Sequence, residues 1–113
     1  MSEIIHPNTF EELKATLGED FVVELVDTYC TEIPTLLDQL QLADDQNDPV
    51  TFQRAAHSIK SSSASLGAMD FSTQAKELEM IGKSGDLSGV GPKVNALRQS
   101  YQSVEQALHT LVS

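Results

Sequence analysis

Apolar residues recur along the chain at alternating intervals of three and four positions, the spacing that places side chains on one face of an α-helix. In the first half, this series consists of Val22, Val26, Tyr29, Ile33, Leu36 and Leu40. Near the C-terminus, it consists of Val94, Leu97, Tyr101, Val104, Leu108 and Leu111. No segment makes a convincing strand, because apolar and polar residues do not alternate as they do in a half-buried strand. The sequence therefore predicts an all-α protein.

The N-terminal part predicts a short helix followed by a long one. Asn8 followed by Glu11 resembles a capping pair at a helix start, and Gly18 is a suitable place for that helix to end. The long helix that follows contains Pro34, which has no backbone N–H and crowds the preceding turn. We therefore expect a kink or a local break near residues 31–33.

The middle of the chain predicts two further helices. Asp48 is a good N-cap and Pro49 suits the first helical position, so one helix begins there. It is expected to end near Gly67, since glycine readily adopts the left-handed conformation that closes a helix. The next helix is expected from about residue 69 to residue 83, with a stop at Gly85.

The length and these elements together predict the fold. A chain of 113 residues is long enough to bury a core of its own and too short for a second domain, so residues 1–113 form one domain. Four long amphipathic helices joined by short loops favour an antiparallel four-helix bundle. We assign about residues 19–112 to the bundle and about residues 8–18 to a short accessory N-terminal helix.

Composition excludes several classes of function. The formal net charge of -10 opposes binding to the phosphate backbone of nucleic acids. The chain has no apolar run long enough to span a bilayer, and the start MSEIIHPN lacks the basic and apolar regions of a secretion signal. Cys30 is the only cysteine, so it forms no internal disulfide, and we interpret it as a buried helix residue. We expect a cytoplasmic protein that binds neither nucleic acid nor membrane.

The acidic residues are concentrated in the first half of the chain. Before Pro49 there are 12 acidic residues and 1 basic residue, whereas from Pro49 onward there are 5 acidic and 6 basic residues. Residues 49–69 contain no acid at all, but they contain Arg54, His57 and Lys60. This window is chemically distinct, because it combines a titratable histidine with nearby cations.

The helical repeat within this window separates a buried face from an accessible one. The residues predicted to face the core are Phe52, Ala56, Ile59, Ser63 and Leu66. Ser63 must then find a hydrogen-bond partner inside the protein. His57 lies about 100° around the helix from Ala56, outside the buried face. The residues predicted to share its accessible stripe are Gln53, Lys60, Ser61, Ala64 and Ala68.

An accessible imidazole at His57 suits phosphoryl transfer. Neutral imidazole carries a nucleophilic lone pair, and histidine changes charge close to neutral pH. A phosphoryl group adds roughly two negative charges, which Lys60 one turn later could partly neutralise and which an adjacent carboxylate would oppose. Because residues 49–69 contain no acid, they would not repel the added negative charge, and the hydroxyl groups of Ser58 and Ser61 could add hydrogen bonds.

The string HSIKSSSASLGA, residues 57–68, resembles the signature of histidine-containing phosphotransfer (HPt) domains, which in outline runs H-x-L-K-G-S-S-x-x-L-G-A. The resemblance covers roughly residues 21–86. It implies a four-helix bundle with an accessory N-terminal helix, in which His57 accepts a phosphoryl group from a receiver-domain aspartate and passes it to another. Lys60 matches the family lysine that supports the phosphohistidine. Ser61 replaces a frequent glycine, and we expect its hydroxyl to be tolerated.

The resemblance also implies partners. These are response-regulator receiver domains and a hybrid sensor histidine kinase, with Mg²⁺ supplied by the receiver domain and no cofactor or metal site in this chain. We expect a monomeric carrier that neither binds ATP nor phosphorylates itself. The residues expected to dock the partner are Gln53, Arg54, Ser58, Ser61, Ala64, Gly67 and Ala68.

Other interpretations of His57 lead to different experiments. A helical module could dock receiver domains without any phosphorylation, and changing His57 to Gln would then leave partner function unchanged. A hydrolase built on the serine cluster would need an orienting carboxylate and an oxyanion hole, which the spacing does not supply. A metal site would need further ligands at i+3 or i+4. We interpret His6 and His109 as surface residues without a function.

Overall fold

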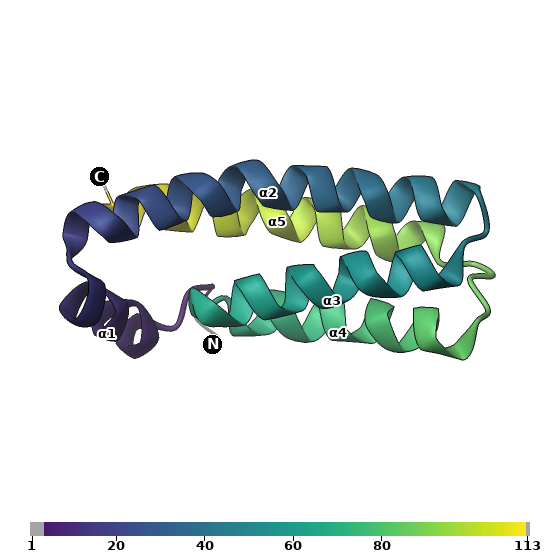
Figure 1. Ribbon diagram of the computed structural model, residues 1–113, viewed down its shortest axis with the longest axis horizontal. Helices are drawn as coiled ribbons and strands as arrows, with labels where there is room; N and C mark the ends of the chain where they lie inside the picture. The colour runs from purple at the N-terminus through teal and green to yellow at the C-terminus, as the bar shows by residue number, and fades with distance from the viewer. Residues whose placement is uncertain (1–3, 113) are drawn as a thin grey trace.

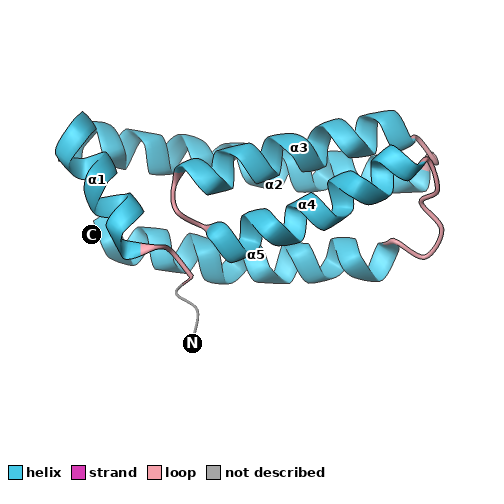
Figure 2. Cartoon of the chain, turned by 90° about the horizontal axis from the view of Figure 1, so that it is seen from below, coloured by secondary structure: helices cyan, strands magenta, loops and turns pink. Residues whose placement is uncertain are grey.

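Five helices account for most of residues 4–112, the part of the chain that this computed structural model describes. They are α1 (Pro7–Leu17), α2 (Glu19–Asp45), α3 (Pro49–Ser65), α4 (Met69–Ser84) and α5 (Gly91–Val112). Helices α2 to α5 run side by side along the long axis, and α1 lies across one end (Figure 1). Short loops join the helices at the ends of the bundle (Figure 2). The predicted all-α four-helix bundle with an accessory N-terminal helix is confirmed.

The four long helices form a closed ring of contacts. Each packs against two others, in the order α2, α3, α4, α5 and back to α2. The contact between α3 and α4 is the most extensive, and α1 packs against α2. The predicted starts and ends in the middle of the chain are confirmed, because Asp48 caps α3 through Thr51 and the left-handed Gly85 ends α4. No helix within residues 4–112 combines the length and the apolarity needed to cross a membrane.

The start of α1 differs from the prediction. The N-cap is His6 and not Asn8, because the Nδ1 atom of His6 accepts a hydrogen bond from the backbone N–H of Thr9 at 3.3 Å. The backbone N–H of His6 also donates to the carbonyl oxygen of Gly67 at 2.7 Å. His6 therefore has a structural function, contrary to our interpretation, since it fixes the start of α1 to the turn between α3 and α4.

Helix α2 continues through Pro34, so a local break near residues 31–33 is wrong, while the alternative that we expected there, a kink, stays a prediction. Pro34 cannot donate to the carbonyl oxygen of Cys30, four residues earlier, and this leaves an acceptor without its usual partner. The hydroxyl of Tyr101 on α5 lies 3.3 Å from that oxygen and also 3.3 Å from Oε2 of Glu105, so its single hydrogen is shared between two acceptors. A tertiary hydrogen bond thus partly compensates for the proline. We expected Cys30 to be buried, but it is only half-buried.

The core follows the predicted series with two exceptions. Leu37 is buried in place of Leu36, which is only partly buried. Leu111 lies in the last turn of α5 and is 37% exposed. All five residues of α3 and its C-cap that were expected to face the core are buried.

Ser63 has the internal hydrogen-bond partner that its burial requires. Its Oγ atom lies 2.7 Å from the hydroxyl oxygen of Tyr29 on α2. Burial of the phenol raises the pKa of Tyr29, so the hydroxyl stays protonated and remains able to donate. The bond satisfies both buried groups and joins α2 to α3 behind the accessible face of α3.

Helices α3 and α4 approach each other closely at Gly82. A Cβ atom added to Gly82 would lie 2.9 Å from the Cα, Cβ and backbone N atoms of Gln53. Only glycine fits there without a shift of one helix. This close approach brings the middle of α4 against the middle of α3.

Candidate functional site

The site is centred on His57, which lies near the middle of α3 beside α4. Its side chain is 57% exposed, so a partner molecule can reach the ring. On the inner side of the ring, Nδ1 lies 2.6 Å from Oε2 of Glu79. The imidazole is therefore held at one nitrogen by the protein and open at its outer edge.

Glu79 on α4 connects His57 with Lys60. Its side chain is only 5% exposed, and its two oxygens have different partners. Oε2 bonds Nδ1 of His57, and Oε1 accepts a hydrogen bond from Nζ of Lys60 at 2.6 Å. Burial alone would raise the pKa of Glu79, but the hydrogen bonds and charges of Lys60 and His57 outweigh burial and lower it. Glu79 is therefore a carboxylate near neutral pH.

The ionised state of Glu79 decides which nitrogen of His57 is reactive. A carboxylate only accepts hydrogen bonds, so Nδ1 must carry the hydrogen that it shares with Glu79. In a neutral imidazole, the other nitrogen then carries the lone pair. That nitrogen is Nε2, on the side of the ring away from Glu79. The arrangement presents a nucleophilic nitrogen to solvent.

Contacts on either side of Glu79 fix α4 against α3. One turn after Glu79, Gly82 lies against Gln53. Two turns before Glu79, the hydroxyl of Ser72 donates to the backbone carbonyl oxygen of Lys60 at 2.8 Å. Because the carboxylate lies between these two contacts, its position relative to the imidazole is set by the packing of both helices.

The two residues that were predicted to carry the chemistry, His57 and Lys60, are connected by a third residue, Glu79. His57 and Lys60 are one turn apart on α3 and both bond Glu79. Lys60 is partly buried and His57 is exposed. The lysine therefore lies within reach of the ring while it is held by the carboxylate.

The predicted docking residues divide into two groups. Arg54 and Ser61 are exposed on α3, and Gln53, Ser58 and Ala64 are partly buried there. Their part in docking stays a prediction. The remaining two, Gly67 and Ala68, are buried and do not form part of the accessible face.

Gly67 and Ala68 were placed on that face by extending the helical repeat too far. Helix α3 ends at Ser65, and Gly67 has a φ of 87°, which redirects the chain into the turn before α4. The backbone of His6 and the side chain of Thr9 cover this turn. Ten helical steps of about 1.5 Å also put the turn about 15 Å from His57.

Glu79 is the site residue that sequence reasoning missed. The stretch around His57 has no acid on α3, and we expected a neighbouring carboxylate to oppose phosphorylation. The missed signal is the repeat of α4 itself, in which Ser72, Ala75, Glu79 and Gly82 follow the three-and-four spacing of a buried face. An acid on such a face must have charged or hydrogen-bonding partners.

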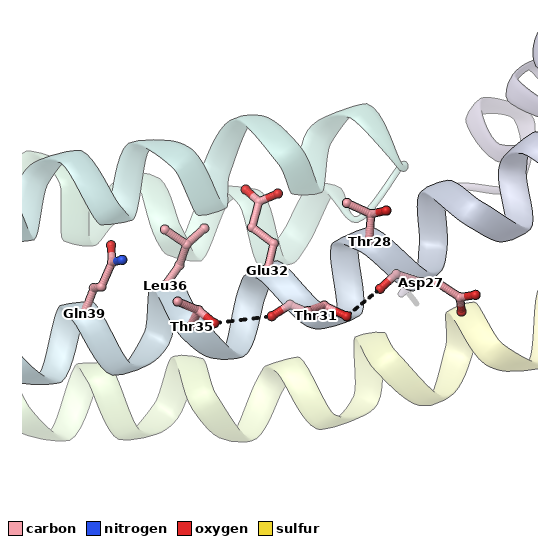
Figure 3. A pocket seen from close by; sticks show the side chains of 7 residues that line it. All are labelled: Asp27, Thr28, Thr31, Glu32, Thr35, Leu36 and Gln39. Carbon is pink, nitrogen blue, oxygen red and sulfur yellow. Dashed lines mark hydrogen bonds between the residues drawn. The ribbon is translucent and has the colours of Figure 1, made fainter.

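The described surface of α2 does not have comparable chemistry. A shallow groove on α2 is lined by Asp27, Thr28, Thr31, Glu32, Thr35, Leu36 and Gln39 (Figure 3). It contains two carboxylates and no cation, so it does not suit a phosphoryl group. Within residues 4–112, no three His, Cys, Asp or Glu side chains converge in a way that could hold a metal ion.

Comparisons with known proteins identify the family to which this sequence is similar. The family model described as "Hpt domain" matches residues 24–111. The phosphorelay protein LuxU of Vibrio cholerae serotype O1 is 28% identical over 114 residues, covering 96% of this chain and 100% of that protein. LuxU of Vibrio harveyi is 24% identical over 109 residues, covering 90% of this chain and 96% of that protein.

Two solved structures share the fold. Histidine-containing phosphotransfer protein B of Pseudomonas aeruginosa PAO1 superimposes with a TM-score of 0.91 at 20% identity, over 99% of this chain and 96% of that one. The HPT domain of the Hpt sensor hybrid histidine kinase from Shewanella superimposes with a TM-score of 0.70 at 22% identity, over 92% and 86%. Both structures have the helical arrangement described above.

Proposed function

The chain belongs to the Hpt domain family of histidine phosphotransfer proteins in phosphorelay signalling, and we propose that His57 is the residue that carries its phosphoryl group. The observation that carries this proposal is the exposed imidazole whose Nδ1 is bonded to the buried Glu79. Of the other histidines, His6 uses its Nδ1 to cap α1, and His109 lies exposed near the end of α5.

The proposed transfer needs no general base in this chain. The lone pair on Nε2 of His57 attacks the phosphorus of an aspartyl phosphate, and a nitrogen–phosphorus bond forms. The bond between phosphorus and the aspartate oxygen breaks, and its electron pair stays on the aspartate as a carboxylate. The hydrogen stays on Nδ1 and keeps its hydrogen bond to Glu79. The negative charge of Glu79 balances the positive charge that the ring gains. The reverse reaction returns the phosphoryl group.

Lys60 is proposed to stabilise the phosphorylated form. Its ammonium group is held by Glu79 at 2.6 Å, one turn from the imidazole, at the end of a flexible stem. A phosphoryl group on Nε2 adds about two negative charges beside it. Lys60 can then move part of its interaction from Glu79 to the phosphoryl oxygens.

The proposed partners are response-regulator receiver domains and a hybrid sensor histidine kinase. Mg²⁺ prefers carboxylate oxygens and substrate phosphates, but both oxygens of Glu79 are already bonded to His57 and Lys60. The partner is therefore proposed to supply Mg²⁺ together with the aspartate. The protein is proposed to be a monomeric cytoplasmic carrier that has no kinase or ATPase activity of its own.

Transfer from a phosphorylated receiver domain tests this function. The purified protein is mixed with the labelled receiver domain and Mg²⁺, and the label is then exposed to acid and to alkali. We expect an acid-labile, alkali-stable label on the wild type and on the control His109→Gln, and none on His57→Gln. Binding of the receiver domain without any label would instead favour a docking module that works without phosphorylation. Labelling of the protein by ATP alone would contradict the absence of kinase activity.

A further inference from the structure

Three basic side chains on α3 and α4 have no ion-pair partner in residues 4–112. Four of the seven basic residues form ion pairs, which are Lys14 with Glu11, Lys60 with Glu79, Lys93 with Glu77 and Arg98 with Asp38. The other three are Arg54, Lys76 and Lys83, and no carboxylate oxygen of the described residues lies within 4.0 Å of their charged groups. All three are exposed, and all lie on α3 or α4.

Arg54 interacts only weakly with the acid nearest to it along the chain. The pKa of Asp48 is lowered mainly by hydrogen bonds from Thr51, and Arg54 contributes least to the shift. Asp48 is already engaged as the N-cap of α3. The guanidinium of Arg54 is therefore largely available to an external anion.

Helical geometry places the three cations around the imidazole. Lys76 and Lys83 lie three residues before and four residues after Glu79, so all three share one face of α4. Arg54 lies one turn before His57 on α3.

The contacts between α3 and α4 set the order along the two helices, which run side by side (Figure 1). Gln53 lies against Gly82, so the neighbouring residues Arg54 and Lys83 lie at one end of the contact between His57 and Glu79. Lys76 lies at the other end, between Ser72 and Glu79, which both bond Lys60.

Helix α2 is acidic, in contrast to the three cations on α3 and α4. That helix contains eight acidic residues and neither lysine nor arginine, and Asp27 and Glu32 line the groove on its surface (Figure 3). The net charge of -10 is therefore unevenly distributed, with negative charge on α2 and positive side chains around His57. A charged partner approaching the molecule experiences attraction at one face and repulsion at another.

We propose that Arg54, Lys76 and Lys83 form a basic rim that docks the acidic phosphoacceptor face of the receiver domain. The inference rests on the function proposed above. An aspartate that exchanges a phosphoryl group with the help of Mg²⁺ needs further carboxylates to hold the metal, so its surroundings are negatively charged. The basic rim attracts that face, and the acidic α2 repels it. Together they orient the partner with its aspartate towards His57.

Because the rim is exposed, it acts mainly on the rate of association. Exposed charges steer encounters by tenfold or more at low salt, and the effect weakens as the Debye length falls to about 8 Å at physiological ionic strength. We therefore expect neutralisation of the rim to lower the association rate constant about tenfold at low ionic strength. The rate of transfer within the saturated complex should not change, since none of the three residues bonds His57 or Glu79.

The experiment compares two triple variants of equal net charge. One is Arg54→Gln with Lys76→Gln and Lys83→Gln, and the matched control is Lys14→Gln with Lys93→Gln and Arg98→Gln, which removes cations that are already paired with acids. Association of each with the receiver domain is followed by stopped-flow fluorescence at low and high ionic strength, and transfer is measured at saturating receiver domain. We expect slower association only for the rim variant, with the difference shrinking at high ionic strength.

The outcomes separate the rim from the proposed function. If both triple variants associate equally slowly, only net charge matters, and the rim is refuted. The same holds if the rim variant associates as fast as the control while the wild type is labelled normally. If the wild type binds the receiver domain without accepting label, the carrier function fails, and the association rates still test the rim.

Discussion

Replacing Gly82 by alanine should disturb the site from a distance, because this residue allows α4 to approach α3. The added Cβ atom would lie 2.9 Å from three atoms of Gln53, two of them in the backbone. Carbon atoms normally pack at about 3.5–4.0 Å, so α4 must move away by at least about 0.6 Å. Glu79 lies one turn earlier on the same face of α4 and would move with it. The distance of 2.6 Å between Glu79 and His57 would then approach the upper limit of a good hydrogen bond, about 3.2 Å.

Two opposing energies decide the effect on stability. Alanine in place of glycine stabilises a helix interior by about 1 kcal/mol. Overpacking against a rigid backbone destabilises by about 1–3 kcal/mol. For Gly82→Ala, we therefore expect a net loss of about 1 kcal/mol, because the clash involves the main chain of α3 and not a side chain that can turn away. The function should suffer more than the fold, since the hydrogen bond at Nδ1 depends on the displaced helix.

Urea unfolding and transfer kinetics measure the two effects. The matched control is Gly91→Ala at the start of α5, where the added Cβ atom would come no closer than 3.7 Å to Asp44, an ordinary contact. We expect Gly82→Ala to be less stable than Gly91→Ala, with an unchanged m-value, and to accept the phosphoryl group more slowly. Equal stability and equal transfer rates in the two variants would refute the proposed role of the close helix contact.

Three further predictions concern single hydrogen bonds. Tyr101→Phe should lower the free energy of unfolding in urea by about 1 kcal/mol, since it removes the donor to the Cys30 carbonyl. This loss should be smaller in a Pro34→Ala background, which restores the helical N–H. An equal loss in both backgrounds would contradict the compensation. The pKa of Glu79 is lowered on folding from an ordinary value of 4.5, so its ionised form stabilises the fold above that pH and loses this contribution below it. Glu79→Gln should therefore show less acid destabilisation, and parallel curves of stability against pH would contradict this. Lys60→Ala should shorten the lifetime of the phosphorylated protein without unfolding it, and an unchanged lifetime would exclude Lys60 from the mechanism.

The parts of the fold that depend on local signals could be predicted from the sequence. Asp48 and Pro49 mark the start of α3 because capping and the fixed proline backbone act within a few residues. The burial of Ser63 followed from the helical repeat, and so did its need for a partner. The identity of that partner, Tyr29, depends on how α2 packs on α3, which no local pattern records.

The failures have the same origin. The N-cap of α1 is His6 because the chain before it is tied to Gly67, so a tertiary contact overrode the local preference for Asn8. Helix α2 continues past Pro34, and Tyr101 on another helix supplies a donor to the carbonyl oxygen of Cys30 that the proline leaves without its helical partner.

The site shows the same limit of sequence reasoning. His57 and Lys60 were found from one helix, whereas Glu79 enters from α4 and reverses the expectation that the imidazole has no carboxylate beside it. The carboxylate bonds the ring at Nδ1 on its inner side, so it orients the nucleophile and balances its charge.

The central claim is that Glu79 holds Nδ1 of His57 so that Nε2 accepts the phosphoryl group. Nuclear magnetic resonance of the ¹⁵N-labelled, phosphorylated protein tests it most directly, because coupling to ³¹P identifies the nitrogen that is bonded to phosphorus. We predict coupling at Nε2 of His57 and a hydrogen retained on Nδ1. Phosphorus on Nδ1, or on any residue other than His57, would contradict the account.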